Sequence, residues 1–530
     1  MIEAYAVADV RAAEEAAMAG LPEGELMARA AQGLAAVVAA RLEERQGMRV
    51  VGLVGSGNNG GDALYALADL AERGFAVAAV HTATAHAGGL AAALEAGVAL
   101  LPADPEADGA ERRGLLAEAD VVVDGLLGIG GRPGLSEEAA GWVDEIPEDA
   151  WVIAVDLPSG ADPAGEVVLG DAVFADETVT FGVAKPVHLL PATEPAVGRL
   201  TVIDIGLDLA RPDASPLPDS RSSRFRGAGA AETENTARPE GGEAAYRPVV
   251  ERLTFDDVRR LWPVPGASSD KYSRGVVGVV AGTPTYPGAA VLSVLGALGA
   301  GPGMVRYLGP PEVQALVHAA APEAVTAEGR VQAWVCGSGF DPTSRAKGVA
   351  EQKHHVQEAL ASDLPVVVDA GALELLDHRS APTLLTPHAG ELARLLSRLR
   401  GEEVTRAEVT SAPLAHAREA AERTGCTVLL KGSHTLVVSA DPSRPVRSQA
   451  DAPAWVGTAG AGDVLGGLLG TLLAAGLDPL DAGALGALVH GVAADRTNPG
   501  GPVRISEVAR RIPETVAALL RRSGGGWGER

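Results

Sequence analysis

A short run of small residues that ends in an aspartate, Thr458 to Asp463, is the part of the chain most suggestive of chemistry. The run leads directly into an apolar segment typical of a buried helix. Because small residues let successive backbone N–H groups converge on an anion at a helix N-terminus, we expect a phosphate-binding site here. Asp463 would stand beside that phosphate, either as a helix cap or as a base for a substrate hydroxyl. Taken alone, the motif favours the cap, since so short a pattern recurs by chance.

A second glycine-rich loop, Gly55 to Asp62, lies between a predicted buried strand and a predicted helix. Strand, glycine turn and helix in this order are typical of nucleotide binding, and the glycine spacing fits the dinucleotide fingerprint. The next strand, however, ends at His81, where that fingerprint requires an acidic residue to hold the ribose. The sequence therefore disfavours ordinary NAD binding, and the polar residues of this loop need another role.

Polar side chains also follow two later strands of the first half. Asn59 belongs to the loop just described, Asp124 follows one of these strands, and Asp156 and Ser159 follow the other. In an open parallel sheet the carboxyl ends of strands meet at one edge, so these side chains would converge. Oxygen ligands without Cys or His suit a hard cation. Alternatively, each of these residues caps the helix or turn that follows it.

The second half repeats the order of strand and glycine loop. His388 follows a Thr-Pro pair between a predicted strand and a predicted helix, which is where ligands bind in open α/β sheets. Lys431 ends another strand beside a glycine turn, which suggests a phosphate contact, although most lysines are surface charges. Strands that alternate with helices in both halves predict an α/β fold.

Composition narrows the class of protein. At 530 residues the chain is long enough for about two to four domains. Its 44 Lys and Arg against 69 Asp and Glu give a charge of -25, which argues against nucleic acid or an anionic membrane as partner. The two cysteines, Cys336 and Cys426, support neither a disulfide framework nor a zinc site. With no secretory signal at the N-terminus, we expect a cytoplasmic protein.

Two stretches could mislead. The span between Arg274 and Arg306 has no charged residue, but glycines and prolines divide it, so we expect a strand, a loop and a helix of a buried core. The stretch 211–250 is rich in Pro, Ser, Arg, Gly, Glu and Ala and is predicted to be a flexible linker.

Five motifs in order, GNNGGD, DGLLGIGGRPG, VDLPSG, TFGVAKP and VIDIG, make residues 1–210 resemble the NAD(P)H-hydrate epimerase domain. The resemblance implies a Rossmann-like three-layer α/β/α sandwich, with K⁺ held by Asn59, Asp124 and Ser159. It implies that Asp156 contacts the hydrated nucleotide, and Asp156 is also our candidate acid/base. The other implied contacts are Asn58, Asn59, Gly60, Gly61, Asp62, Gly128, Ile129, Gly130, Gly131, Arg132, Pro133 and Gly134. Ala63 departs from a common glycine, without expected consequence.

Residues 251–525 resemble the ADP-dependent NAD(P)H-hydrate dehydratase domain, a member of the ribokinase-like fold, through the stretch 271–290 and the motifs TPHAGE, LKGSHT and GTAGAGD. The implied contacts with the hydrated nucleotide are Ala289, Gly339, His388 and Asp463. The implied adenosine-nucleotide contacts are Lys431, Gly432, Ser433, His434, Thr435 and Gly462. The loop 451–455 lacks the asparagine and glycine that are common there.

Together the two resemblances predict an enzyme that repairs hydrated NADH and NADPH. The first domain would interconvert the R and S hydrates, and the second would dehydrate the S form with ADP as co-substrate and Mg²⁺ as cofactor. Phosphorylation turns a poor leaving group into a good one, and Asp463 would take the hydroxyl proton. We expect a homo-oligomer. The alternatives are a ribokinase-like vitamin kinase fused to a nucleotide-binding domain, or a nucleotide sensor without turnover.

Overall fold

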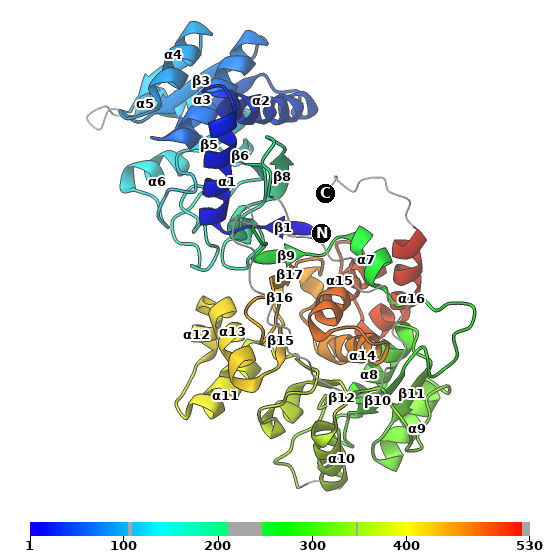
Figure 1. Ribbon diagram of the computed structural model, residues 1–530. Helices are drawn as coiled ribbons and strands as arrows, with labels where there is room; N and C mark the ends of the chain where they lie inside the picture. Colours follow the sequence, from blue (N-terminus) through cyan, green and yellow to red (C-terminus); the bar gives the residue numbers. More distant parts are fainter. Residues whose placement is uncertain (104–108, 210–245, 346–347, 522–530) are drawn as a thin grey trace.

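Two α/β units built on separate sheets make up the molecule, as Figure 1 shows. The computed structural model describes residues 1–103, 109–209, 246–345 and 348–521. Most of the predicted linker, residues 211–245, lies outside the described residues. The prediction of an α/β fold with a Rossmann-like first unit and a ribokinase-like second unit is confirmed. No helix in the described ranges is long and apolar enough to cross a membrane.

The first sheet is parallel throughout, with seven strands in the order β4-β3-β2-β5-β6-β7-β8. The chain builds outward from β2 to β4 and then returns to β5 on the other side of β2. This reversal leaves a crevice at the carboxyl ends of β2 and β5, where open sheets bind ligands. The strands are β2 (Arg49–Val54), β3 (Ala76–His81), β4 (Ala99–Pro102), β5 (Val121–Gly125), β6 (Trp151–Val155), β7 (Glu177–Phe181) and β8 (Arg199–Ile203).

Helices cover both faces of this sheet because its strands are apolar on both sides. Helices α2 and α3 pack over one face with strand residues such as Val121 and Val123, whereas Val122 belongs to a core on the other face. The helices are α1 (Val7–Gly20), α2 (Glu25–Arg45), α3 (Asn58–Glu72), α4 (Ala87–Glu95), α5 (Ala110–Ala117) and α6 (Glu137–Val143), with short 3₁₀ turns η1 (Pro186–His188) and η2 (Glu194–Ala196).

The second sheet has ten strands in the order β1-β9-β17-β16-β15-β14-β13-β12-β10-β11. Strands β10 to β15 pair in parallel, and β15, β16 and β17 form an antiparallel meander. The strands are β1 (Ile2–Ala4), β9 (Val250–Arg252), β10 (Val276–Val280), β11 (Met304–Tyr307), β12 (Ala333–Cys336), β13 (Val366–Val368), β14 (Thr383–Leu385), β15 (Thr427–Leu430), β16 (Thr435–Val438) and β17 (Val446–Gln449).

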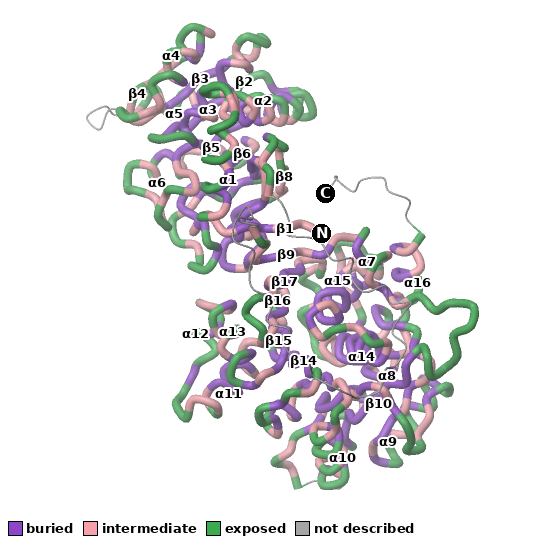
Figure 2. The backbone as a smooth tube through the Cα atoms, viewed as in Figure 1, coloured by how far each residue is buried: buried purple, intermediate pink, exposed green. Residues whose placement is uncertain are grey.

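Two helical layers sandwich the parallel part of the second sheet. Helices α8, α14, α15 and α16 share one core with alternate strand residues such as Val277, Val279 and Val335, while the opposite alternation faces α10, α11 and α13. Figure 2 shows α14 and α15 buried along most of their length. The helices are α7 (Phe255–Leu261), α8 (Pro287–Gly299), α9 (Pro311–Ala320), α10 (Val349–Ala361), α11 (Ala389–Arg400), α12 (Arg406–Ser411), α13 (Pro413–Thr424), α14 (Ala461–Ala474), α15 (Pro479–Thr497) and α16 (Ile505–Arg521), with 3₁₀ turns η3 (Ala370–Leu375) and η4 (Ala454–Val456).

The organisation of the chain agrees with one prediction and adds one feature that was not predicted. The uncharged span after Arg274 is the strand β10, a loop and α8, all within the second core, as predicted. The beginning of the chain was not foreseen, because β1 pairs antiparallel with β9 and so belongs to the second sheet. The Met1 ammonium lies 2.8 Å from Asp257 Oδ2. The first residues therefore tie the helical start of the first unit to the second unit, between the two in Figure 1.

Candidate active sites

A cavity of about 530 Å³ opens at the carboxyl ends of the first sheet, at the crevice between β2 and β5. It collects the loops after β2, β5 and β6, as predicted, but also one side of α1. Its lining residues are Arg11, Glu14, Glu15, Met18, Ser56, Gly57, Asn58, Asn59, Asp62, Leu127, Gly128, Ile129, Gly130, Gly131, Asp156 and Phe181. The contribution of α1 was not foreseen, since its Ala-rich pattern indicates only an amphipathic helix.

Glycines let the loops around this cavity approach each other closely. Gly57 precedes α3 with φ of 95°, a conformation that favours glycine. A side chain at Gly55 would collide with the carbonyl of Leu126, and one at Gly60 would collide with the carbonyl of Gly55. The N-terminus of α3, at Gly57, Asn58 and Asn59, therefore lies at the cavity, where it favours an anionic group.

The predicted acid/base Asp156 is held ionised by a buried lysine. Lys185, only 1% exposed, places Nζ 2.6 Å from Asp156 Oδ1, and Thr180 Oγ1 donates to the same oxygen at 2.8 Å. Burial alone would raise the pKa of Asp156, but the Lys185 ammonium outweighs it and lowers the pKa. The imidazole Nε2 of His188 lies 2.8 Å from the Asp156 carbonyl, and Asp156 adopts φ of 67°. An aspartate in this strained region is rare and is typical of functional sites.

Asp62 and Glu14 complete an acidic wall of the same cavity. Burial raises the pKa of Asp62 well above its ordinary value, and the nearby carboxylates of Asp156 and Glu14 raise it further. Burial likewise raises the pKa of Glu14. One cavity thus contains an aspartate with a lowered pKa, Asp156, and an aspartate with a raised pKa, Asp62. Such divergent pairs suit general acid and base roles.

The residues predicted to hold a cation do meet. Ser159 donates its hydroxyl to Asp124 Oδ1 at 2.6 Å and its backbone N–H to Oδ2 at 2.8 Å. The Leu127 carbonyl accepts from Asn59 Nδ2 at 3.0 Å and from Ser159 Oγ at 3.3 Å. Burial raises the pKa of Asp124 to about 6, against hydrogen bonds donated by the neutral N–H groups of Leu126 and Ser159 and by the Ser159 hydroxyl.

Five of the predicted substrate contacts of the first half do not line the cavity. Gly60 and Gly61 are buried in the first turn of α3, where they permit close packing. The remaining three, Arg132, Pro133 and Gly134, lie further along the loop after β5, and the first two are exposed.

In the second half, Lys431 lies among three carboxylates. Its Nζ is 2.8 Å from Asp369 Oδ1 and 3.7 Å from Glu391 Oε2. Burial alone would lower the pKa of Lys431, but Asp369 and Glu391 raise it, and Asp463 contributes in the same sense. Asp369 is almost fully buried and also accepts hydrogen bonds from Ser338 Oγ at 3.1 Å and Thr386 Oγ1 at 2.8 Å.

Asp463 lies in the first turn of α14 but does not cap it. The cap residue is Gly460, with φ of 94°, and no side chain caps this helix. Burial and the neighbouring Asp369 carboxylate raise the pKa of Asp463 to about 6, against the opposing hydrogen bond from Ser338 and charge of Lys431. The alternative that the motif by itself favours, a helix cap, is therefore wrong, and the carboxylate is available for chemistry at the helix N-terminus.

The other predicted contacts of the second half form three groups. A parallel bridge places His388 beside Lys431, but its Nδ1 accepts from the N–H groups of Gly390 and Glu391, so His388 caps α11. Ala289 and Gly339 are neighbours, since a Cβ on Gly339 would lie 2.6 Å from that of Ala289.

The nucleotide residues are the third group. A Cβ on Gly462 would lie 3.2 Å from Lys431 Nζ, so this glycine adjoins the lysine and its carboxylates. Gly432 and Ser433 are exposed in the turn between β15 and β16, and Thr435 begins β16. His434, in the same turn, instead places Nε2 2.9 Å from Glu194 Oε2.

Sequence reasoning missed Lys185, Asp369 and Glu391. Lys185 lies within the TFGVAKP motif and Asp369 directly follows a buried strand, so the position of each in the sequence could have marked it as a candidate site residue. What no local pattern indicates is that each aspartate would be paired with a lysine from a distant segment.

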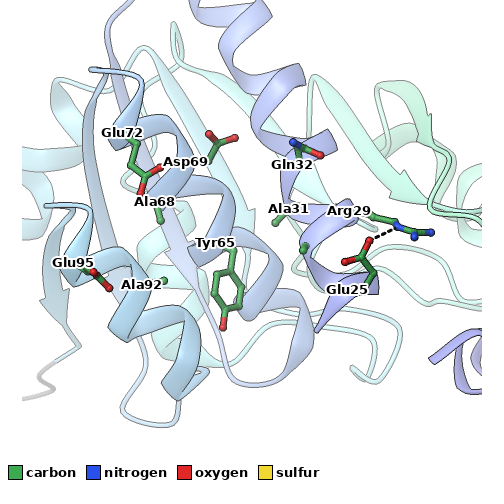
Figure 3. A pocket seen from close by; sticks show the side chains of 11 residues that line it. Glu25, Arg29, Ala31, Gln32, Tyr65, Ala68, Asp69, Glu72, Ala92 and Glu95 are labelled. Carbon is green, nitrogen blue, oxygen red and sulfur yellow. Dashed lines mark hydrogen bonds and ion pairs between the residues drawn. The ribbon is translucent and has the colours of Figure 1, made fainter. Parts of the chain in front are cut away.

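A further hollow of about 510 Å³ lies on the outer surface of α2, α3 and α4, and Figure 3 shows its side chains. Alanines form much of its floor, and several acidic side chains surround it. One of them, Glu25, is paired with Arg29 at 3.0 Å. It contains none of the predicted residues and no glycine loop, so we assign it no role.

Comparisons with known proteins match both halves of the chain. Residues 23–187 match the family model described as YjeF-related protein N-terminus, and residues 277–506 match the model described as NAD(P)H-hydrate dehydratase. The bifunctional NAD(P)H-hydrate repair enzyme Nnr of Mycobacterium leprae is 40% identical over 97% of this chain and 99% of its own. The NAD(P)H-hydrate epimerase of Clavibacter sepedonicus is 42% identical over 42% of this chain and 96% of its own.

Among solved structures, the ADP/ATP-dependent NAD(P)H-hydrate dehydratase of Bacillus subtilis, co-crystallized with ATP and Mg²⁺, is 26% identical. It covers 51% of this chain and 98% of its own, with a TM-score of 0.43.

Proposed function

Because the chain belongs to the family of bifunctional NAD(P)H-hydrate repair enzymes, we propose that its two sites act in turn on one damaged cofactor. The protein is an NAD(P)H-hydrate epimerase and an NAD(P)H-hydrate dehydratase. We assign epimerisation to residues 1–210 and dehydration to 251–525, with 211–250 as linker. Strand β1 is the exception, since it lies in the second sheet. The observation that carries the residue roles is that each half holds a lysine-paired aspartate beside a second aspartate of raised pKa.

In the first half, Asp156 and Asp62 move the protons that let the hydrated ring open and close. The hydroxyl at C6 loses its proton and becomes a carbonyl as the bond between C6 and the ring nitrogen breaks, and the nitrogen takes up a proton. The reverse steps on the other face of the carbonyl re-form the bond with the opposite configuration at C6. Asp156, kept ionised by Lys185, accepts a proton, and Asp62, which keeps its own proton, returns one. The amides at the start of α3 and the glycines of the loop after β5 hold the nucleotide. The same cavity serves both hydrates because each differs from the other only at C6.

The donor set of Asn59, Asp124 and Ser159 fits K⁺. Asp124 is fully buried, and the groups that donate hydrogen bonds to it, from Leu126 and Ser159, are neutral, so a bound cation would compensate its charge. K⁺ would supply charge compensation and would hold the loops after β2, β5 and β6 together. Asn59 itself lines the cavity, so its position is the link between the cation and the substrate.

In the second half, Asp463 takes the proton of the C6 hydroxyl, and the hydroxyl oxygen bonds to the β-phosphorus of ADP as the bond to the AMP oxygen breaks. Phosphate then leaves C6 with the C–O electron pair while C5 loses a proton, which restores the double bond of NAD(P)H. Lys431 and the amides at the start of α14 hold the transferring phosphoryl group. Asp369 keeps Lys431 in place.

The second site also fits Mg²⁺ that is held mainly by phosphate. The described residues contain no cluster of three or more His, Cys, Asp or Glu side chains able to hold a metal. Mg²⁺ ordinarily takes one or two carboxylates plus substrate phosphates, and Glu391, beside Lys431, could supply a carboxylate while bound ADP supplies the phosphates. Mg²⁺ would supply neutralisation of phosphate charge. A homo-oligomer and a cytoplasmic location remain proposals, to be tested by light scattering and by fractionation.

The test is recovery of the reduced-nicotinamide absorbance when the protein is mixed with hydrated NADH, ADP and Mg²⁺. We expect complete recovery from a mixture of both hydrates, because epimerisation feeds the S form to dehydration. Recovery that stops when the S form is used up would refute the epimerase. No recovery would refute the repair function, and a stable phosphorylated product would identify a kinase instead.

A further inference from the structure

One turn of the second half is held in place by the first half. The turn between β15 and β16, residues 431–434, carries Lys431 at one end and His434 at the other. His434 Nε2 lies 2.9 Å from Glu194 Oε2, and the two side chains are 13% and 15% exposed. Glu194 begins η2, between β7 and β8 of the first unit. A contact between an imidazole and a carboxylate therefore joins the predicted nucleotide turn of one unit to the other unit.

Glu194 is fixed by a second cation. Arg252 of β9 donates hydrogen bonds to both carboxylate oxygens of Glu194, at 2.6 and 2.5 Å. It also donates to the carbonyls of Ser448 and Leu189. Burial alone would raise the pKa of Glu194, but the hydrogen bonds from Arg252 and His434 lower it. A carboxylate that is ionised, buried and held by a bidentate arginine is a rigid point to which His434 can be anchored.

His434 has little freedom to contact a nucleotide with its ring nitrogens. Nε2 faces Glu194, and Nδ1 lies 3.3 Å from Ser433 Oγ. The ring therefore holds the turn in place through its contacts with Glu194 and Ser433. Lys431, three residues earlier, is the member of the turn that reaches the carboxylates of Asp369 and Glu391. A displacement of His434 would be transmitted to Lys431 through a backbone of three residues.

We propose that Glu194, a residue of the epimerase half, is a positioning residue for the nucleotide site of the dehydratase half. Acting through His434, it holds the 431–434 turn so that Lys431 meets the phosphates of ADP. The inference rests on the proposed ADP-dependent dehydration. It means that the second site is completed by the first unit.

The stretch of chain from Lys185 to Glu194 also reaches the first site. Lys185 and His188, which contact Asp156, lie at one end of it, and Glu194 lies at the other. Thr193 Oγ1 donates to the Val187 carbonyl at 2.7 Å and Glu194 N donates to the Leu190 carbonyl at 2.9 Å, so the segment is compact. One short piece of chain thus supports the acid/base of the first site and the nucleotide turn of the second.

The experiment compares full-length Glu194→Gln, His434→Asn and the double variant with the wild type. We expect KM for ADP to rise about tenfold in each single variant, within the range that coupled sites show. The double variant should be no worse than His434→Asn, because Glu194 acts through that residue. The rate constant at saturating ADP and the epimerisation rate should change by less than twofold, roughly, whereas general destabilisation would lower both. His434→Asn leaves the pair of Glu194 and Arg252 intact, which keeps the test valid if Glu194→Gln folds poorly.

Glu166→Gln is the matched control. Glu166 pairs with Arg418 at 2.9 Å across the same two units, but both side chains are about half exposed and neither touches the nucleotide turn. Its KM for ADP should equal that of the wild type. An unchanged KM in Glu194→Gln and His434→Asn, or fully additive effects in the double variant, would overturn the inference while the wild type still dehydrates with ADP. Failure of the wild type to do so would overturn the proposed function and this inference with it.

Discussion

Both halves of the molecule use an aspartate held by a lysine and a second aspartate nearby, but they bury these groups differently. In the first half Lys185 is 1% exposed beside Asp156, while in the second half Lys431 is 22% exposed beside Asp369. In the first half the lysine-paired aspartate itself lines the substrate cavity. In the second half the lysine-paired aspartate, Asp369, is almost fully buried, and the other aspartate, Asp463, lies in the first turn of α14.

This difference matches the chemistry of each half. Epimerisation changes no net charge, so a closed site can keep one carboxyl protonated and one ionised. Phosphoryl transfer brings a strongly anionic nucleotide to the site, so Lys431 must be reachable by phosphate as well as by Asp369. A lysine paired with an aspartate therefore supports proton transfer where both are buried, and binds phosphate where the lysine is partly exposed.

The largest expected effect is to separate the two reactions by replacing Asp463 or Asp62, the two aspartates whose pKa is raised. Asp463→Asn should lower ADP-dependent dehydration of pure S hydrate by about 10²–10⁴-fold, the usual contribution of a general base, and leave epimerisation intact. Asp62→Asn should do the reverse. Dehydration is followed by nicotinamide absorbance, and epimerisation by chromatographic separation of the R and S hydrates. If either variant lost both activities, the assignment of one aspartate to each reaction would fail.

Removal of each lysine should show the difference in burial directly. Lys185→Met leaves Asp156 buried without its cation and should reduce the free energy of unfolding by about 3–5 kcal/mol. Lys431→Met should cost less, because water already reaches that lysine. Urea unfolding followed by circular dichroism measures both, with Lys353→Met on α10 as the control. If the two variants lost equal amounts of unfolding free energy, the difference in exposure between Lys185 and Lys431 would not affect stability.

The pH dependence of the two reactions should differ in sign. Asp463 acts as a base with pKa about 6, so kcat/KM for dehydration should fall about tenfold for each pH unit below 6. Epimerisation should hold over that range, because the pKa of Asp156 is lowered and the pKa of Asp62 is raised well above its ordinary value. It should decline instead as pH rises through the raised pKa of Asp62. Each rate is measured against a blank without protein, and parallel profiles would contradict the different protonation states.

The smallest expected effect concerns the cation. Replacement of K⁺ by a bulky organic cation should slow epimerisation several-fold and leave dehydration of the S hydrate unchanged, because the donors around Asp124 occur only in the first half. Asp124→Asn should make epimerisation insensitive to K⁺. Equal sensitivity of both reactions would place the K⁺ effect elsewhere in the molecule.

Local sequence was enough to predict the loops of both sites. Glycine positions, strand patterns and the polar residues after each strand are short-range features, and the ordered motifs indicated both domains. The cavity of the first half does contain Asn58, Asn59, Asp62 and Asp156, because parallel strands bring their carboxyl ends to one edge.

Only the tertiary structure decided which charges are paired. Lys185 and Asp156 are 29 residues apart, Lys431 and Asp369 are 62 apart, and β1 joins a strand that begins at Val250. The contact of Glu194 with His434 likewise depends on how two units dock. No pattern of residues encodes such distances, because pairing and burial depend on the whole packed fold. Those contacts determine which aspartate is ionised, and so what each one can do.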